Sequence, residues 1–218
     1  MRTMFPVLMV VLLAVFVLSL CLGDQQLSVD EIRTALFHRE EGPAYIDTIL
    51  WALRLPRASM AVLVGAALGV AGAVSQSIMR NPLAEPGLLG INAGAALVAI
   101  LVIIELQSVS EALLPWLTFA GACGMSAAIY ALSWKQGTTS LRIILVGVGL
   151  SSLGGAAASF ISTFGDITSV QRAMVWLAGS LQDSRWVKVE VLGLWLILPV
   201  ALVWVRVWLI VAAPRVWS

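Results

Sequence analysis

The chain has 218 residues, of which 60% are hydrophobic and only 11% are charged, and its mean hydropathy is +0.97. A soluble domain carries roughly 25% charged residues, so this composition excludes an ordinary water-soluble globule and favours a membrane protein. The formal net charge of +1 comes from scattered Lys and Arg residues, which excludes the basic patch that a nucleic-acid-binding protein needs.

Six apolar runs are long enough to cross a bilayer, since a spanning helix needs about 20 mostly apolar residues, with a range of roughly 17–25. Backbone groups in lipid must be hydrogen-bonded within the segment, so each run is predicted to be helical. In chain order, the predicted spans are Phe5–Leu22, Ala58–Met79, Leu88–Ile104, Leu113–Trp134, Ile143–Phe164 and a run from Trp186 to at least Val205. The fold class that follows is all-α, a polytopic transmembrane helical bundle.

The first apolar run follows Met1-Arg2-Thr3 and has the general form of a secretory signal. A cleavage site needs small residues at its end, whereas Leu18-Ser19-Leu20-Cys21 places leucine just before the expected cut. We therefore expect a retained helix, with a cleaved signal as the alternative.

A long polar stretch, Gly23 to Arg57, is predicted to be a loop between the first two spans. Within it, Ser28 and Glu31 have the spacing of a capping box, in which each residue bonds to the backbone of the other at a helix start. The pattern predicts a short amphipathic helix over Val29–Phe37. An ordinary solvated loop is the alternative.

Small residues recur at helical spacing within the predicted spans. Gly65 and Gly69 are four residues apart, as are Gly90 and Gly94. Glycine lets two helix backbones approach closely, so these faces predict a compact bundle. Lys and Arg residues are shared almost evenly between the two sides of the membrane, so their distribution leaves the topology open.

No grouping of residues for catalysis is present in the sequence. There is no P-loop, so the chain itself lacks that route to ATP hydrolysis. The single histidine, His38, lies in a polar loop, and Cys21 and Cys123 lack metal-ligand spacing. No predicted helix centre carries an acidic residue for a proton relay. We predict no enzyme activity and no directly bound metal or cofactor, and transport would need energy from a partner.

A succession of short motifs carries a family resemblance. Arg54-Leu55-Pro56-Arg57 leads into Val64–Leu68, and then comes Arg80-Asn81-Pro82-Leu83-Ala84-Glu85-Pro86-Gly87-Leu88-Leu89-Gly90. Leu145–Leu150 is similar to the family's fifth helix, and Trp176–Ser180 to the loop that follows it. The sequence resembles the FecCD/BtuC-like permease family of ABC importers for ferric siderophores, haem and cobalamin.

The resemblance implies a type II ABC importer. A second permease subunit, in a homo- or heterodimer, would complete the pathway, and a cytoplasmic ABC ATPase would supply ATP and Mg chemistry. A periplasmic binding protein would deliver the substrate, with iron(III)-siderophore uptake preferred over haem or cobalamin. The implied location is the bacterial inner membrane, with a cytoplasmic N-terminus and the segment Arg54–Arg57 facing the periplasm.

Site residues carried over from the family are predictions of two kinds. Arg54 and Arg57 match the arginines that meet glutamates on the binding protein, although they could be ordinary interfacial arginines. Seven residues are pathway or gate candidates, although the segment that holds the first four could be only a rigid turn. They are Asn81, Pro82, Glu85, Pro86, Asn92, Thr139 and Ser140.

The end of the chain departs from the family pattern. Family members have about ten membrane helices, of which this sequence offers about six. We expect residues 1–205 to be the N-terminal part of the permease domain and residues 206–218 to be an aberrant tail from a shifted reading frame. The alternatives to a siderophore permease are a non-transporting truncated fragment and a haem or cobalamin permease.

Overall fold

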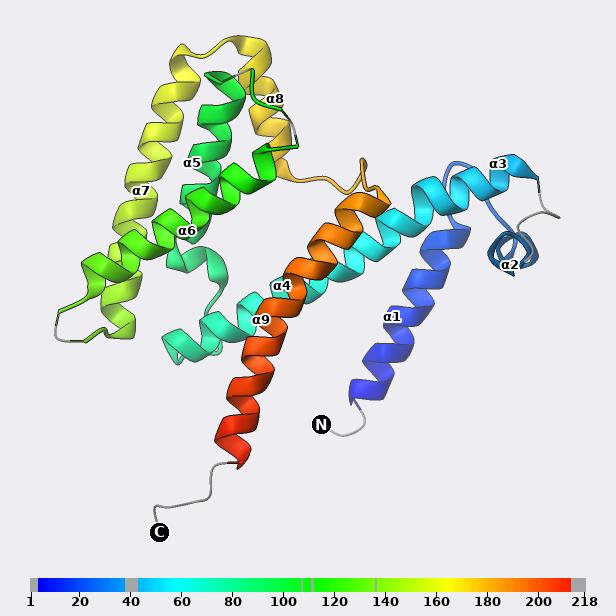
Figure 1. Ribbon diagram of the computed structural model, residues 1–218, viewed down its shortest axis with the longest axis horizontal. Coiled ribbons are helices and arrows are strands. Elements are labelled where there is room, and N and C mark those ends of the chain that lie inside the picture. The colour runs from blue at the N-terminus through cyan, green and yellow to red at the C-terminus, as the bar shows by residue number, and fades with distance from the viewer. Residues whose placement is uncertain (1–3, 38–42, 107, 111, 136, 213–218) are drawn as a thin grey trace. The chain divides into compact units, whose positions relative to one another are not determined.

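A computed structural model describes residues 4–37, 43–106, 108–110, 112–135 and 137–212, with side chains up to residue 205. Every regular element in these ranges is helical, which confirms the all-α fold (Figure 1). The chain divides into two compact units, residues 1–70 with 181–218 and residues 71–180. Among the described residues, five helical stretches are long and apolar enough to span a membrane: Met4–Cys21, Ala44–Met79, Leu114–Ser133, Ser140–Phe164 and Trp186–Val205.

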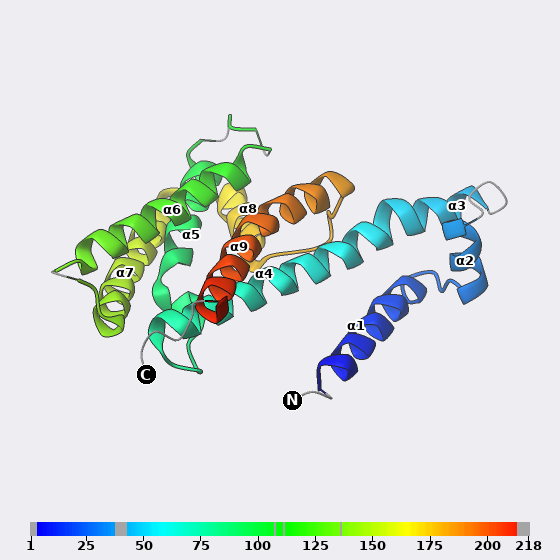
Figure 2. The same cartoon turned by 60° about the horizontal axis from the view of Figure 1, so that its bottom comes forward.

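The first unit begins with α1 (Met4–Cys21), whose exposed side chains are apolar except for Ser19. A helix that is hydrophobic all round suits lipid surroundings. The connection that follows contains α2 (Val29–Phe37). Helix α1 runs beside the first part of the long helical stretch Ala44–Met79 (Figure 2). A small core joins these segments, formed by Leu20, Leu27, Ile32, Ala35, Ile46 and Leu50.

The predicted capping box at the start of α2 is confirmed. The Glu31 carboxylate accepts hydrogen bonds from the Ser28 backbone N–H at 2.7 Å and from its hydroxyl at 2.9 Å. The Glu31 N–H in turn donates to Ser28 Oγ at 3.2 Å. These bonds hold the pKa of Glu31 below its ordinary value of 4.5, and the bond from the Ser28 backbone N–H has the largest effect.

We expect α2 to loosen at acid pH. The pKa of Glu31 is depressed in the folded state, so its contribution is present above the unfolded pKa and is lost as pH falls through the folded value. Hydrogen exchange of the α2 amides should therefore quicken in acid relative to the α1 amides. In Glu31→Gln, which removes the titrating group, this acid-specific change should be absent; its persistence would contradict the capping role.

The predicted loop Gly23–Arg57 is wrong over its second half. Residues Ala44–Met79 form one helical stretch, made of α3 (Ala44–Asp47), η1 (Thr48–Arg54) and α4 (Leu55–Met79). The sequence prediction began the second span only at Ala58. Pro56 lies inside the observed helical stretch, although proline lacks an N–H and clashes with the preceding turn.

The π-helical spacing of η1 removes that obstacle. The Leu55 N–H bonds to the Leu50 carbonyl, five residues back. At this spacing the donor to the Trp51 carbonyl would be the backbone N–H of residue 56, and Pro56 has none. The Trp186 indole N–H donates to that carbonyl instead, at 2.8 Å. A tertiary contact with the start of α9 (Trp186–Ala212) thus satisfies the carbonyl beside the proline.

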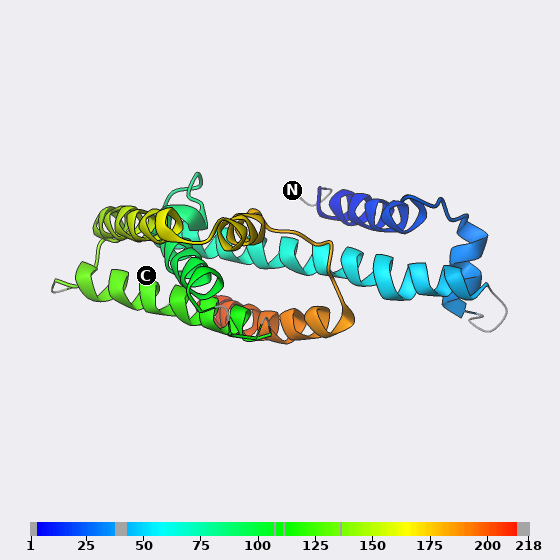
Figure 3. The ribbon, with the colours of Figure 1, turned by 90° about the horizontal axis from the view of Figure 1, so that it is seen from above.

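The second unit is built around α5 (Ile91–Ile104). It packs against α6 (Leu114–Ser133), α7 (Ser140–Phe164) and α8 (Ile167–Ala178), and Figure 3 shows it between α6 and α7. Asp166 caps α8 by accepting from the Ser169 N–H at 3.0 Å. This short helix includes Trp176–Ala178, which sequence reasoning had placed in a loop.

The predicted third span, Leu88–Ile104, is shorter than expected. A 3₁₀ turn, η2 (Pro86–Leu89), comes first, and Gly90 has a left-handed backbone with φ 81°. The α-helix begins only at Ile91 and has 14 residues, which at 1.5 Å each give about 21 Å. That length falls below the roughly 30 Å of a bilayer core. The structure therefore has five long spans and one short apolar helix in the described ranges.

Glycines set the spacing of the helices in the second unit. An added Cβ at Gly94 would lie 2.5 Å from the Gly121 carbonyl oxygen on α6. An added Cβ at Gly147 on α7 would lie 2.5 Å from the Leu89 carbonyl oxygen. Real side chains do not tolerate such distances, so these backbones touch because the side chains are absent.

Candidate functional site

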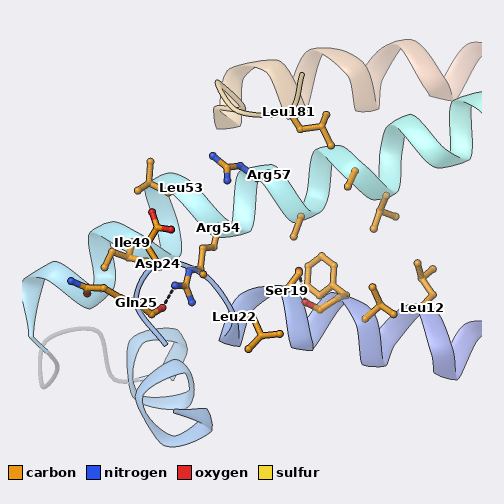
Figure 4. A pocket seen from close by; sticks show the side chains of 16 residues that line it. Leu12, Ser19, Leu22, Asp24, Gln25, Ile49, Leu53, Arg54, Arg57 and Leu181 are labelled. Carbon is orange, nitrogen blue, oxygen red and sulfur yellow. Dashed lines mark hydrogen bonds between the residues drawn. The ribbon is translucent and has the colours of Figure 1, made fainter. Parts of the chain in front are cut away.

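The two arginines predicted to dock a partner lie on the same helical stretch but point to different sides (Figure 4). Arg54, at the end of η1, is half-buried and turns toward the end of α1. Its guanidinium donates to the backbone carbonyls of Leu20, Cys21 and Gln25, with 3.1 Å to Cys21. Arg54 is therefore engaged inside the first unit.

Arg57, one turn later in α4, is exposed. Its Nη2 donates one hydrogen bond, of 3.2 Å, to the Gln182 carbonyl. Guanidinium has five N–H donors in a planar fork, so one such bond leaves capacity for a carboxylate. Of the two arginines, Arg57 is the more exposed and makes fewer hydrogen bonds within the described residues.

A cavity of about 740 Å³ lies between α1 and the long helical stretch (Figure 4). Its walls are mainly apolar, with Leu12, Val15 and Phe16 on α1 facing Ala61 and Val62 on α4. Polar lining residues gather at one end, where the loop after α1 begins. They are Ser19, Asp24, Gln25, Arg54 and Arg57.

The first four pathway candidates lie in the turn between α4 and α5. Asn81 Oδ1 accepts from the Leu83 N–H at 2.9 Å, and the Ala84 N–H donates to the Asn81 carbonyl at 3.1 Å. Asn81, Pro82 and Glu85 are exposed, whereas Pro86 is half-buried at the start of η2. The turn is thus internally bonded, with its polar groups on the surface.

A small cluster anchors this turn to the start of α7. Met79, Ala84 and Leu89 are buried, and Ile91, Ile143 and Ile144 pack against them. Ser140, another gate candidate, donates its hydroxyl to the Ile78 carbonyl near the end of α4, at 2.8 Å. The structure therefore brings Ser140 to the end of α4, where the Asn81–Pro86 turn begins.

The two remaining candidates have more local positions. Thr139 is the N-cap of α7, and its hydroxyl oxygen accepts from the Arg142 N–H at 3.4 Å. Asn92 is exposed on the first turn of α5. Both placements are compatible with a pathway role, which stays a prediction.

Arg142 is a residue that sequence reasoning missed. Its Nη1 donates to the carbonyls of Ser133, Lys135 and Gly137, at 3.3, 3.5 and 3.2 Å. These carbonyls lie at and just beyond the C-terminal end of α6, where a cation is favourable and backbone acceptors lack helical donors. The signal was available, since Arg142 follows a short turn directly after an apolar run.

Arg142→Met is expected to destabilise the second unit by about 1–2 kcal/mol, because charge-assisted bonds to three carbonyls are lost. Thermal unfolding of the purified protein in detergent would measure the change. Lys135→Met is the matched control, since it removes an exposed cation from the same turn. Equal stability of the two variants would show that Arg142 does not hold the turn.

No group of three or more His, Cys, Asp or Glu side chains capable of holding a metal occurs within the described ranges. Cys21 and Cys123 are free thiols. His38 lies outside the described residues.

Comparisons with known proteins all point to the same family of transport proteins. Residues 11–211 match the FecCD transport family. The achromobactin transport system permease protein CbrC of Dickeya dadantii is 39% identical over 210 residues, which are 95% of this chain and 58% of that protein. The iron(3+)-hydroxamate import system permease protein FhuG of Bacillus subtilis is 36% identical, covering 86% of this chain and 56% of that protein.

A solved structure agrees with these relatives. It is described as an inward-facing conformation of a metal-chelate type ABC transporter, and it superposes with a TM-score of 0.74 at 30% identity. The match covers 87% of this chain and 57% of that one. The chain thus spans a little over half the length of these relatives and of this structure. On the match over residues 11–211, the chain belongs to the FecCD transport family.

Proposed function

We propose that this chain acts as a permease subunit of an ATP-driven ABC importer that takes iron(III)-siderophores across the bacterial inner membrane. The observation that carries the proposal is the family match over residues 11–211, which includes both units of the structure. Relatives named for achromobactin and for iron(3+)-hydroxamate support an iron chelate as the substrate.

The partners follow from the same proposal. A second permease subunit completes the pathway, a cytoplasmic ABC ATPase binds ATP and Mg, and a periplasmic binding protein delivers the chelate. The N-terminus is assigned to the cytoplasm, so the end of α1 and Arg57 face the periplasm. Arg57 then presents its positive charge to the docking surface, where charge pairing raises the encounter rate.

The second unit supplies the proposed cytoplasmic end of the pathway. We assign this role to the turn Asn81–Pro86 and to Thr139 and Ser140, because the Ser140–Ile78 bond and the Met79–Ala84–Leu89 cluster tie the ends of α4 and α7 together. Tight helix contacts make this unit move as a body, since close-packed interfaces deform little. ATP-driven motion would then be transmitted through the contact between the end of α4 and the start of α7.

Substrate choice is the finer part of the proposal. Relatives also include a hemin permease of Yersinia pestis, 38% identical over 139 residues, and a cobalamin permease of Halobacterium salinarum, 38% identical over 149 residues. The iron chelate is preferred because relatives that match 86% or more of this chain are named for iron(3+)-hydroxamate import, iron uptake or siderophore transport.

An uptake assay tests the function. Cells lacking their own siderophore permease would receive this chain with an ATPase and a binding protein from the same genome, and radiolabelled ferric siderophore, hemin and cobalamin would be offered in turn. ATP-dependent accumulation of ferric siderophore alone is the expected result. Accumulation of hemin or cobalamin would change the substrate. Membrane insertion without any uptake would support the non-transporting alternative.

A further inference from the structure

The π-helical turn η1 contains a backbone carbonyl that its own helix does not serve, and a side chain of another helix serves it instead. We propose that η1 can adopt two hydrogen-bond registers and that the indole N–H of Trp186, at the start of α9, holds it in the wide π-helical one. Without that bond the turn would take ordinary α-helical spacing. All the contacts involved lie within the first unit, so the turn can be tested whether or not the chain transports a substrate.

Pro56 removes one hydrogen bond from the segment in either register. In an α-helix each N–H bonds to the carbonyl four residues back, so the missing N–H of residue 56 would leave the Ala52 carbonyl without its donor. In a π-helical turn the spacing is five residues, and the carbonyl without a helical donor is that of Trp51. The bond from the Leu55 N–H to the Leu50 carbonyl shows that η1 has the second register. The register therefore decides which carbonyl needs a donor from outside the helix.

Trp186 supplies that donor in one register only. Its Nε1 donates to the Trp51 carbonyl at 2.8 Å. In α-helical spacing the Leu55 N–H would bond to this carbonyl, and the indole bond would be redundant. A contact shifts a two-state element only by the difference that it makes between the two states, and the indole bond is such a difference. Since π-helical turns are rare, an α-helical turn is the state expected once the bond is lost.

The same turn is linked to α2 through the side chain of Trp51. Its Nε1 donates to the Ala35 carbonyl in α2 at 3.0 Å, and its ring lies 6.4 Å from the ring of Trp186 between centroids. Trp186 itself is 38% exposed, so its bond can open without unpacking a core. Movement of the start of α9 away from η1 would therefore release the π-helical register and disturb the bond to α2 as well.

Spin labels on either side of η1 would measure its register in the full chain. They are attached at Tyr45→Cys in α3 and Leu68→Cys in α4, both exposed positions, after Cys21→Ser and Cys123→Ser remove the native thiols. A change of register alters the direction of one label relative to the other, so each register gives its own distance in pulsed electron resonance. The parent chain should give one distance. Trp186→Phe keeps a ring but lacks the N–H, and it should reveal a second distance by shifting the ratio roughly tenfold.

Trp51→Phe is the matched control. It removes the other indole of the pair but keeps the backbone carbonyl that accepts from Trp186. The single distance should therefore persist in this variant. If Trp51→Phe revealed the second distance as readily as Trp186→Phe does, packing of the two rings rather than the carbonyl bond would hold the turn. An unchanged distance in Trp186→Phe would also overturn the proposal.

Pro56→Ala tests the reason for the dependence on Trp186. With an N–H at residue 56, the carbonyls of residues 51 and 52 both have donors within the helix, so α-helical spacing should prevail and the second distance should dominate. Adding Trp186→Phe should then change nothing, and an undiminished effect would show that Trp186 acts independently of the proline. A benzothienylalanine at position 186 has the shape of tryptophan with sulfur in place of the N–H, and it should behave like phenylalanine. Tryptophan-like behaviour of this residue would show that the N–H does not hold the turn.

Discussion

Gly90→Ala is expected to prevent the second unit from folding stably, with a loss of about 3 kcal/mol or more. Gly90 has φ 81°, a conformation that costs an L-residue roughly 1–2 kcal/mol. The new methyl would also lie 2.5 Å from the Gly147 carbonyl oxygen and closer still to Ser151 Oγ. Thermal unfolding and the yield of monodisperse protein in detergent would measure the loss.

Gly149→Ala on α7 is the matched control for that experiment. Nothing lies within 4 Å of a Cβ at this position. Alanine stabilises a helix interior by roughly 0.5–1 kcal/mol relative to glycine, so this variant should be neutral or slightly more stable. If both alanines gave the same unfolding temperature, close contact between η2 and α7 could not be what fixes the turn.

Gly94→Ala is expected to cost about 2 kcal/mol by forcing α5 and α6 apart. Its methyl would lie 2.5 Å from the Gly121 carbonyl oxygen and would also meet Met125 Cβ. Backbone atoms on the partner helix cannot turn aside as a side chain can. The change would be measured by unfolding in the same detergent as the parent protein.

Two further variants test whether the close contact between α5 and α6 is the cause. Gly121→Ala should destabilise similarly, because its Cβ would lie 2.7 Å from the Gly94 carbonyl oxygen, and the double variant should be non-additive. Gly124→Ala, one turn along the same helix, meets nothing within 4 Å and should be harmless. Destabilisation by Gly124→Ala equal to that by Gly94→Ala would point to a general intolerance of α5 and α6 rather than to the crossing.

The sequence predicted helix positions correctly where they are determined by residues within the helix itself. Apolar length predicted four of the long spans closely, and the spacing of Ser28 and Glu31 predicted α2 with its correct bounds. Both signals depend on residues a few positions apart. The match of the Arg80–Gly90 motif to a family was likewise readable from contiguous residues.

The errors arose where a distant residue or an unusual backbone angle decides the local structure. The Trp51 carbonyl, which Pro56 cannot serve, accepts from the Trp186 indole, 135 residues away from Trp51 in sequence. The third span was overestimated because Leu88 and Leu89 are apolar, whereas Gly90 sets the helix start through its backbone angle. Arg54 and Arg57 look equivalent in sequence, and only the position of α1 distinguishes them.

The tail from residue 206 onward stays a prediction. Helix α9 continues to Ala212, and the remaining residues lie outside the described ranges. The roles of Asn81, Pro82, Glu85, Pro86, Asn92, Thr139 and Ser140 in the pathway are likewise proposals, to be tested through uptake.

The wide turn of η1 has a consequence for which sequence changes this segment can accept. A π-helical turn holds one more residue than an α-helical turn, and one residue corresponds to about 100° of rotation about the helix axis. Leu50, completely buried, and Arg54 both face the α1 side of the helix across this turn. Deleting one residue between them would rotate one partner away by about a quarter of a revolution. The interval between the core leucine and the arginine is therefore expected to tolerate substitutions far better than single-residue insertions or deletions.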